Sequence, residues 1–254
     1  MHRLELVALD GVPLVKTGDD LAAITLDALA RTRLSLVDRD VLVFAQKIVS
    51  KSENRMVRLD SIVPSLRAQE LANLTEKDAR LIEIILAESR EVLRVRAGVI
   101  VVEDTRGLVL ANAGVDASNV NADGGDGSVL LLPADPDASA TRLREALCAR
   151  TGRDVGIVIN DSIGRAWRNG TIGTAIGVSG LPGLLDLRGA PDLFGRALRT
   201  TDLGFADEIA SAASLVMGQA GEGRPIVLAR GIPYSRREGS ARELVREKTL
   251  DFFR

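Results

Sequence analysis

The chain has 254 residues, with 46% hydrophobic and 27% charged residues, which is the composition of a globular protein with a sizeable core. Its formal net charge of -2 argues against nucleic acid as a partner, and no apolar run approaches the roughly 20 residues that a membrane span needs. The first apolar run is also too short for a signal peptide, so we expect a cytoplasmic protein.

Periodicity predicts a mixture of helices and strands in the first half of the chain. Helical spacing after a capping residue predicts a helix over 17–33, and an apolar strand follows at 41–44. Two further helices are expected over 65–74 and 78–94. Two β-branched runs flank a short Asp-Thr-Arg-Gly turn, which predicts a hairpin over 98–114.

The second half continues without regular alternation of strand and helix. The expected elements are a strand at 129–132, a helix from about Asp137, a strand at 155–160, an extended segment at 173–181, a helix, glycine-rich loop and strand over 207–231, and a terminal helix over 240–254. This order favours an α+β fold over a doubly wound sheet. We interpret residues 1–254 as one domain with internal subdomains.

The chain has a single cysteine, Cys148, and a single histidine, His2. These counts exclude disulfide scaffolds, cysteine-based zinc sites and histidine-dependent triads. Cys148 lies within a helical pattern and is expected on its buried face. A metal ion would be held mainly by oxygen, which favours Mg²⁺, Mn²⁺ or Ca²⁺.

Lys47 and Lys51 follow shortly after the strand at 41–44. Each lysine is preceded by a polar residue, Gln46 and Ser50 respectively. Cations at a strand end can bind phosphate oxygens while backbone N–H groups approach the same oxygens. A solvated charged turn is the alternative for this segment.

The loop that begins at Asn112 carries Asp116, Ser118 and Asn119, which place three side-chain oxygens within four residues. Hard cations accept such ligands. Asx turns use the same residues merely to close the backbone, so both interpretations stay open for this loop.

Asp161 ends the apolar run Val-Gly-Ile-Val-Ile-Asn, where a carboxylate that binds a metal beside a phosphate is often found, and Ser162 adds a second oxygen. Arg165 and Arg168 could neutralise phosphate oxygens or a substrate carboxylate through forked hydrogen bonds. In the alternative interpretation, Trp167 lies in the core and the two arginines form surface ion pairs.

The segment 217–224 places three glycines after the end of a helix. Its backbone can approach a ligand closely, but the helix dipole would repel phosphate there. Phosphate binding would need a metal ion or a nest of N–H groups, and a plain C-cap is the alternative. The segments together favour a metal–phosphate site that acts through positioning and electrostatics, as in phosphoryl transfer.

Eight runs of the sequence resemble the coenzyme F420-0:γ-glutamyl ligases. They occur in family order and read GVPLVKTGDDL, DVLVFAQKIVSKSENR, NAGVDASNV, LLLPADPDASA, VINDSIGRAWRNG, AIGVSGL, DLFGRAL and MGQAGEGRPIVLARG. The resemblance implies an unusual α+β ligase fold with largely antiparallel sheets and packed helices, and an intertwined homodimer. It also implies GTP as co-substrate, Mg²⁺ or Mn²⁺, and assistance by K⁺.

The activity implied by the resemblance is the joining of L-glutamate to the lactyl carboxylate of F420-0, followed in many members by extension of a γ-linked tail. An acyl phosphate made from the GTP γ-phosphate would be the intermediate. The acceptor could also be a variant F420 precursor or another carboxylate, and a GTP- or F420-binding protein without catalysis is a further alternative.

The resemblance also assigns roles to individual residues. The implied nucleotide contacts are Val12, Pro13, Leu14, Val15, Gln46, Lys47, Lys51, Asn119, Met217, Gly218, Gln219, Ala220, Gly221, Glu222, Gly223 and Arg224. The implied metal ligands are Asp116, Asp161, Ser162 and Gln219. Our own hypothesis adds Arg165 and Arg168 to Lys47 and Lys51 as catalytic residues that face phosphate or the anionic substrate.

Two positions depart from the family pattern. Archaeal members commonly carry Glu at the position of Gln219 and Thr at that of Ser162. A neutral amide should weaken metal binding, so we expect Gln219→Glu to change the Mg²⁺ and Mn²⁺ activation curves. Some relatives carry a fused flavin-binding domain. None follows the ligase motifs here, so we expect no flavin.

Overall fold

The structure is a computed structural model that describes residues 3–117 and 127–252. His2, Ser118 and Asn119 therefore lie outside the described residues. In chain order the elements are β1 (Glu5–Ala8), α1 (Leu21–Arg31), β2 (Val41–Ala45), α2 (Gln46–Ser52), β3 (Met56–Arg58), η1 (Leu59–Ser61), α3 (Leu66–Thr75), α4 (Ala79–Ala87), β4 (Ser89–Arg96), β5 (Val99–Asp104), β6 (Val109–Ala111), η2 (Asn112–Gly114), β7 (Ser128–Leu130), α5 (Pro136–Thr151), β8 (Gly156–Arg165), β9 (Arg168–Ser179), β10 (Leu185–Asp186), β11 (Asp202–Leu203), α6 (Phe205–Met217), β12 (Ile226–Arg230), η3 (Ala241–Leu244) and η4 (Lys248–Leu250).

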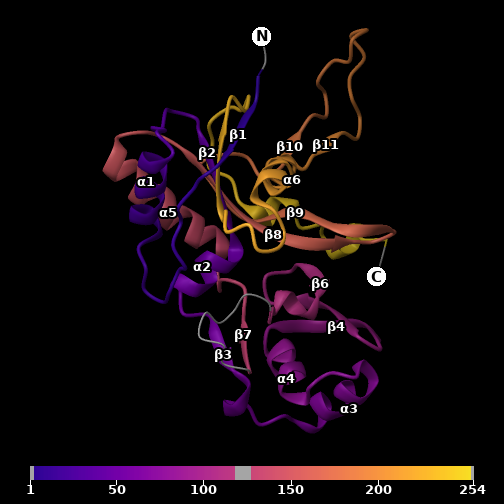
Figure 1. Cartoon of the computed structure of the whole chain (residues 1–254). Coiled ribbons are helices and arrows are strands. Elements are labelled where there is room, and N and C mark those ends of the chain that lie inside the picture. The colour runs from indigo at the N-terminus through magenta and orange to yellow at the C-terminus, as the bar shows by residue number, and fades with distance from the viewer. Residues whose placement is uncertain (1–2, 118–126, 253–254) are drawn as a thin grey trace.

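A five-stranded sheet of order β1-β12-β2-β8-β9 forms the centre of the molecule (Figure 1). The strands β2 and β8 are parallel, whereas the other neighbouring pairs are antiparallel. The predicted α+β class with largely antiparallel sheets is thereby confirmed.

Helices cover both faces of this sheet. On β2, Leu42 and Phe44 belong to the core shared with α1 and α5, whereas Val41 and Val43 belong to the core shared with α6. Successive side chains of a strand point to opposite faces, so a strand covered on both sides is apolar throughout. This explains the uninterrupted apolar run at 41–44.

A second lobe lies below the sheet in Figure 1 and has its own core. It combines α3 and α4 with the small sheet β4-β5-β6. The antiparallel pair β3–β7 runs between this lobe and the rest of the chain. The loop with Asp116 follows β6 and so leaves this lobe close to the main sheet.

Several expected elements are confirmed with small shifts. The first helix begins at Leu21 because the Asp20 carboxylate caps it by accepting from the Ala23 N–H at 3.0 Å. The hairpin over 98–114, the helix near Asp137 and the helix–loop–strand unit at 207–231 are present. Cys148 is half-buried against the main core. In the described part of the chain, no helix is long and apolar enough to cross a membrane.

The helix predicted over 78–94 is wrong beyond Ala87. From Ser89 the chain forms β4, which pairs with β5, and Val92 lies opposite Val102. The local helical pattern loses to cross-strand pairing because β-branched residues fit a half-buried sheet well.

The terminal helix predicted over 240–254 is also wrong. The described part of this segment holds two single 3₁₀ turns, η3 and η4. Glu243 accepts a hydrogen bond from the Leu184 N–H at 3.0 Å and pairs with Arg237 at 2.6 Å. The segment therefore serves as a strap whose side chains bind other elements.

Candidate active site

At one edge of the main sheet β2 ends and β12 begins, and β8 continues past this edge towards Arg165. Because β2 and β8 are parallel and Ala45 lies opposite Asn160, helix α2 and the residue Asp161 emerge at the same edge. The antiparallel strand β12 begins there as well, since Ile226 lies opposite Phe44. The glycine-rich loop (Gly218–Arg224) precedes β12 and is brought to this edge too.

Two carboxylates and two lysines meet at this edge. The Nζ atom of Lys47 lies 2.7 Å from Oδ2 of Asp116. Burial raises the pKa of Asp161 to about 6; the Ser162 N–H opposes this rise, nearby Asp116 adds to it and Lys47 opposes it. Lys51 lies one helical turn after Lys47, and its pKa is lowered by burial and by the charge of Lys47. The alternative interpretation, a solvated charged turn, is wrong in its conformation: the segment is the short helix α2, which presents both lysines on one face.

A left-handed turn delivers Asp116 to the site. Asn112, Ala113 and Gly114 have φ angles of 55°, 53° and 70°, a run that L-residues rarely adopt. The backbone of Asp116 then exchanges two hydrogen bonds with Leu130, of 3.0 and 2.8 Å. A Cβ on Gly114 would lie 2.6 Å from the Leu132 side chain, so packing there requires glycine.

Ser162 and Gln219 link β8 to the glycine-rich loop. The Ser162 hydroxyl donates to Oε1 of Gln219 at 2.5 Å, and Nε2 of Gln219 donates to the Ser214 hydroxyl at 2.7 Å. Sequence reasoning missed Ser214, since nothing in a helical apolar run marks it.

The donor set fits a hard cation. Two carboxylates, a hydroxyl and a carboxamide are the oxygen ligands that Mg²⁺ and Mn²⁺ accept, and Lys47 already supplies positive charge to Asp116. Within residues 3–117 and 127–252, no three His, Cys, Asp or Glu side chains form a metal-binding group. A cation at this edge would therefore need the neutral oxygens of Ser162 and Gln219 as well as the two carboxylates.

The glycine-rich loop turns back on itself after α6. Gly218 caps the helix with φ 81° and ψ 175°, a conformation open essentially only to glycine. The Glu222 carboxylate accepts a hydrogen bond from the Ala220 N–H at 2.8 Å. The loop thus presents N–H groups to an anionic oxygen although it follows a helix C-terminus.

Asn160, which sequence reasoning also missed, lies beneath this edge. It is only 3% exposed, and its Nδ2 contacts the sulfur of Met217 at 3.7 Å. Its Oδ1 has no hydrogen-bond partner among the described residues. A polar residue at the end of an apolar strand run is the sequence signal that could have marked it.

The structure does not bring Arg165 and Arg168 to the two carboxylates. They face each other across the turn at the far end of the β8–β9 hairpin. Four residues of strand, roughly 13 Å, separate Arg165 from Asp161. Trp167 occupies that turn and is 85% exposed, so its placement in the core is wrong. The catalytic role of the two arginines stays a prediction.

The remaining predicted nucleotide contacts differ in where they lie. The segment 12–15 precedes Gly18, whose N–H donates to the Ser52 carbonyl at the end of α2 (2.9 Å). Gln46 is buried and its Oε1 accepts from the Ser50 hydroxyl at 3.0 Å, so its side chain points into the protein. Asn119 lies outside the described residues.

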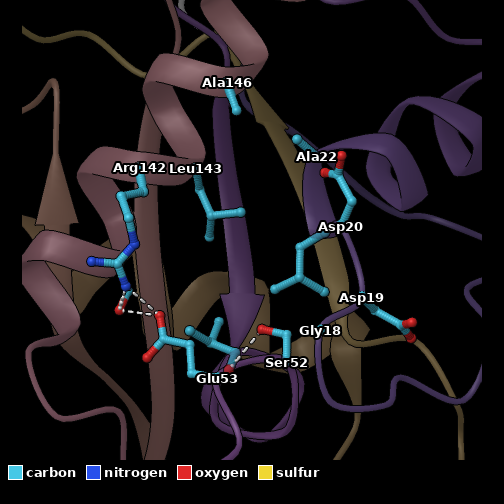
Figure 2. A pocket seen from close by; sticks show the side chains of 12 residues that line it. Gly18, Asp19, Asp20, Ala22, Ser52, Glu53, Arg142, Leu143 and Ala146 are labelled. Carbon is cyan, nitrogen blue, oxygen red and sulfur yellow. Dashed lines mark hydrogen bonds and ion pairs between the residues drawn. The ribbon is translucent and has the colours of Figure 1, made fainter.

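A cavity of about 280 Å³ lies between α1, α2 and α5 (Figure 2). Its α2 residues, Val49 and Ser52, occupy the face of that helix opposite Lys47 and Lys51. Of its charged side chains, Arg142 and Glu53 form an ion pair of 2.6 Å, as Figure 2 shows, and Asp20 pairs at 2.6 Å with Arg150, which lies outside the lining. The predicted site residues therefore gather outside this cavity.

Comparison with known proteins agrees with the motifs. The profile of the family described as F420-0:Gamma-glutamyl ligase matches residues 11–231. Proteins called Coenzyme F420:L-glutamate ligase are 45% identical in Methanothermobacter thermautotrophicus, with 99% of both chains covered, and 44% identical in Methanopyrus kandleri, with 100% of both covered. The protein of that name in Methanocaldococcus jannaschii is 40% identical over 100% of this chain and 98% of its own. The chain belongs to the F420-0:Gamma-glutamyl ligase family.

Proposed function

We propose that this chain is a GTP-dependent ligase that joins L-glutamate to the lactyl carboxylate of F420-0 and extends a γ-linked glutamyl tail. The names of the relatives support F420 and L-glutamate as substrates. The observation that carries the nucleotide part is the meeting of Lys47, Lys51, Asp116 and Asp161 beside a glycine-rich loop.

The proposed reaction has two displacements. A carboxylate oxygen of F420-0 attacks the γ-phosphorus of GTP, and the bond from phosphorus to the GDP oxygen breaks. The amine of L-glutamate then attacks the acyl carbon, loses a proton, and inorganic phosphate leaves. Such chemistry depends on positioning and charge neutralisation, which explains how a site with no histidine among its described residues can serve.

The residues of the site divide this work. Lys47 and Lys51 neutralise phosphate oxygens, and the N–H groups of the glycine-rich loop approach the same ligand. Asp116, Asp161, Ser162 and Gln219 would hold Mg²⁺ or Mn²⁺, which would further neutralise the phosphates. K⁺ remains an expectation from the family resemblance.

The first test follows the F420 species by mass spectrometry after incubation with F420-0, L-glutamate, GTP and Mn²⁺. We expect a ladder of added glutamyl units, and a parallel reaction with ATP measures nucleotide preference. Unchanged F420-0 beside a protein that binds GTP would favour another carboxylate acceptor or a binding role without catalysis.

We infer that two copies of the chain form a homodimer through projecting hairpins. Trp167 lies in the turn between β8 and β9. Leu193 and Phe194, which are 99% and 86% exposed, lie beyond the Pro191–Ala197 bridge, in the arm that extends from β10 and β11 in Figure 1. The Asp192 carboxylate fixes this part of the arm by accepting from two N–H groups at 2.8 Å. Large apolar groups on a fixed segment favour burial against a second copy. Light scattering should give a dimer mass, and Phe194→Asp should lower it.

A further inference from the structure

The carboxylate of Glu222 already fills the space in which the glycine-rich loop would hold an anion. The Ala220 N–H donates to its Oε2 at 2.8 Å. A Cβ placed on Gly218 would lie only 2.4 Å from the carboxyl carbon of Glu222. The glutamate side chain thus folds back against the backbone of its own loop, over a glycine that leaves room for it.

The contact is one between an anion and a backbone nest. The hydrogen bond from the Ala220 N–H is the main cause that lowers the pKa of this carboxyl, and the nearby N–H groups of Glu222 itself and of Gln219 add to the effect. The loop follows the C-terminus of α6, where the helix dipole disfavours negative charge. The N–H groups overcome that effect for a carboxylate, so the same groups can hold a phosphate oxygen.

We propose that Glu222 determines which anions the loop accepts: its carboxylate excludes simple anions such as inorganic phosphate, and a nucleotide polyphosphate displaces it. This inference rests on the proposed use of GTP. A tethered carboxylate competes at a high effective concentration. A free phosphate ion that competes with this carboxylate makes few other contacts with the protein. A polyphosphate can also contact the two lysines of α2, which lie at the same edge of the sheet.

Glu222 should therefore have its largest effect on the release of the product inorganic phosphate. Inorganic phosphate leaves in the proposed reaction, and a vacant nest would hold it. With Glu222 present, the carboxylate returns to the N–H groups as phosphate departs. Removal of this carboxylate should make inorganic phosphate a stronger inhibitor. The two lysines and the binding of GTP should be unaffected.

The test compares the wild type with Glu222→Ala and Glu222→Gln by calorimetric titration with inorganic phosphate and, separately, with GTP. We expect phosphate to bind about tenfold more tightly to Glu222→Ala, and less so to Glu222→Gln, whose neutral oxygen still accepts the hydrogen bonds. Phosphate should also inhibit turnover of both variants more strongly. Glu145→Ala, which removes an exposed charge on α5, is the matched control and should leave phosphate binding unchanged.

Repetition at 0.5 M KCl removes general charge effects, because screening then leaves mainly direct contacts. Equal or weaker phosphate binding by folded Glu222→Ala, with GTP still bound by the wild type, would overturn the inference and leave the proposed function standing. A wild type that binds no GTP would instead count against the proposed function.

Discussion

The two ends of the β8–β9 hairpin differ sharply although one short sequence run encodes them. At its base, Asp161 and Ser162 interact with side chains from the loop after β6, from α2 and from the glycine-rich loop. At its tip, Arg165 donates to the Asn169 carbonyl at 3.2 Å, within its own hairpin. Adjacent polar residues of a motif can therefore belong to different surroundings, and long-range contacts decide which of them form the site.

Side chains from α6 and from the C-terminal segment also hold the base of the hairpin in place. The Asp207 carboxylate of α6 accepts from the Ala175 N–H at 2.8 Å, where the register between β8 and β9 shifts. Glu243 anchors Leu184, just beyond β9. A rigid base suits a site whose groups must stay in fixed positions.

Substitutions at the base and at the tip of the hairpin should differ most in their effect on ligase turnover. We expect Asp161→Asn to lower ligase turnover by about a hundredfold or more, because a half-buried carboxylate proposed to hold the metal becomes neutral. Steady-state rates over a range of Mn²⁺ concentrations measure this. Turnover within threefold of the wild type would remove Asp161 from the metal site.

Alanine substitutions at two glycines, one near each end of the hairpin, should change the free energy of unfolding by different amounts. A Cβ on Gly173, at the base, would lie 2.4 Å from the Ala210 carbonyl oxygen and 2.6 Å from Oδ1 of Asn160, whereas a Cβ on Gly164 meets nothing within 4 Å. We expect Gly173→Ala to lower the free energy of unfolding by about 2–3 kcal/mol and Gly164→Ala to change it little. Denaturant titration compares the two, and equal effects would contradict a tightly packed base.

The anchor behind the base should weaken in acid. Arg237 is the main group that lowers the pKa of Glu243, to about 2. Because the folded-state pKa lies below the ordinary value, this carboxylate stabilises the fold above about pH 4.5 and loses that effect as the pH falls towards 2. Allowing for its partial exposure, we expect Glu243→Gln to cost about 2 kcal/mol at pH 7 and much less at pH 3. A cost independent of pH would contradict the ion pair.

The smallest effect should come from the tip. Within its own chain Arg165 lies roughly 13 Å along the strand from Asp161, so we expect Arg165→Ala to change turnover and KM less than about threefold unless the side chain acts at the site of a second copy. The same kinetic assay as for Asp161→Asn measures it. A loss as large as that of Asp161→Asn would show that the tip acts at a site on a second copy, and would support the arginine hypothesis.

Local sequence was sufficient for much of the fold. The strand at 41–44, the hairpin over 98–114 and the helix after Asp135 follow from apolar periodicity, turn residues and capping, which act over a few positions. The segments that were wrong, β4 and the terminal strap, are those whose partners lie elsewhere. Their conformation depends on β5 and on Leu184, which no local pattern specifies.

For the site, the sequence by itself determined the chemical inventory: oxygen ligands, two lysines, a glycine-rich loop and a single histidine, His2. Only the tertiary structure decided which of these meet. The parallel register of β2 and β8 places Lys47 beside Asp161, and the same strand carries Arg165 away from them. The physical reason is that a strand advances about 3.3 Å per residue, so neighbours in sequence diverge while hydrogen-bonded strands bring distant residues together.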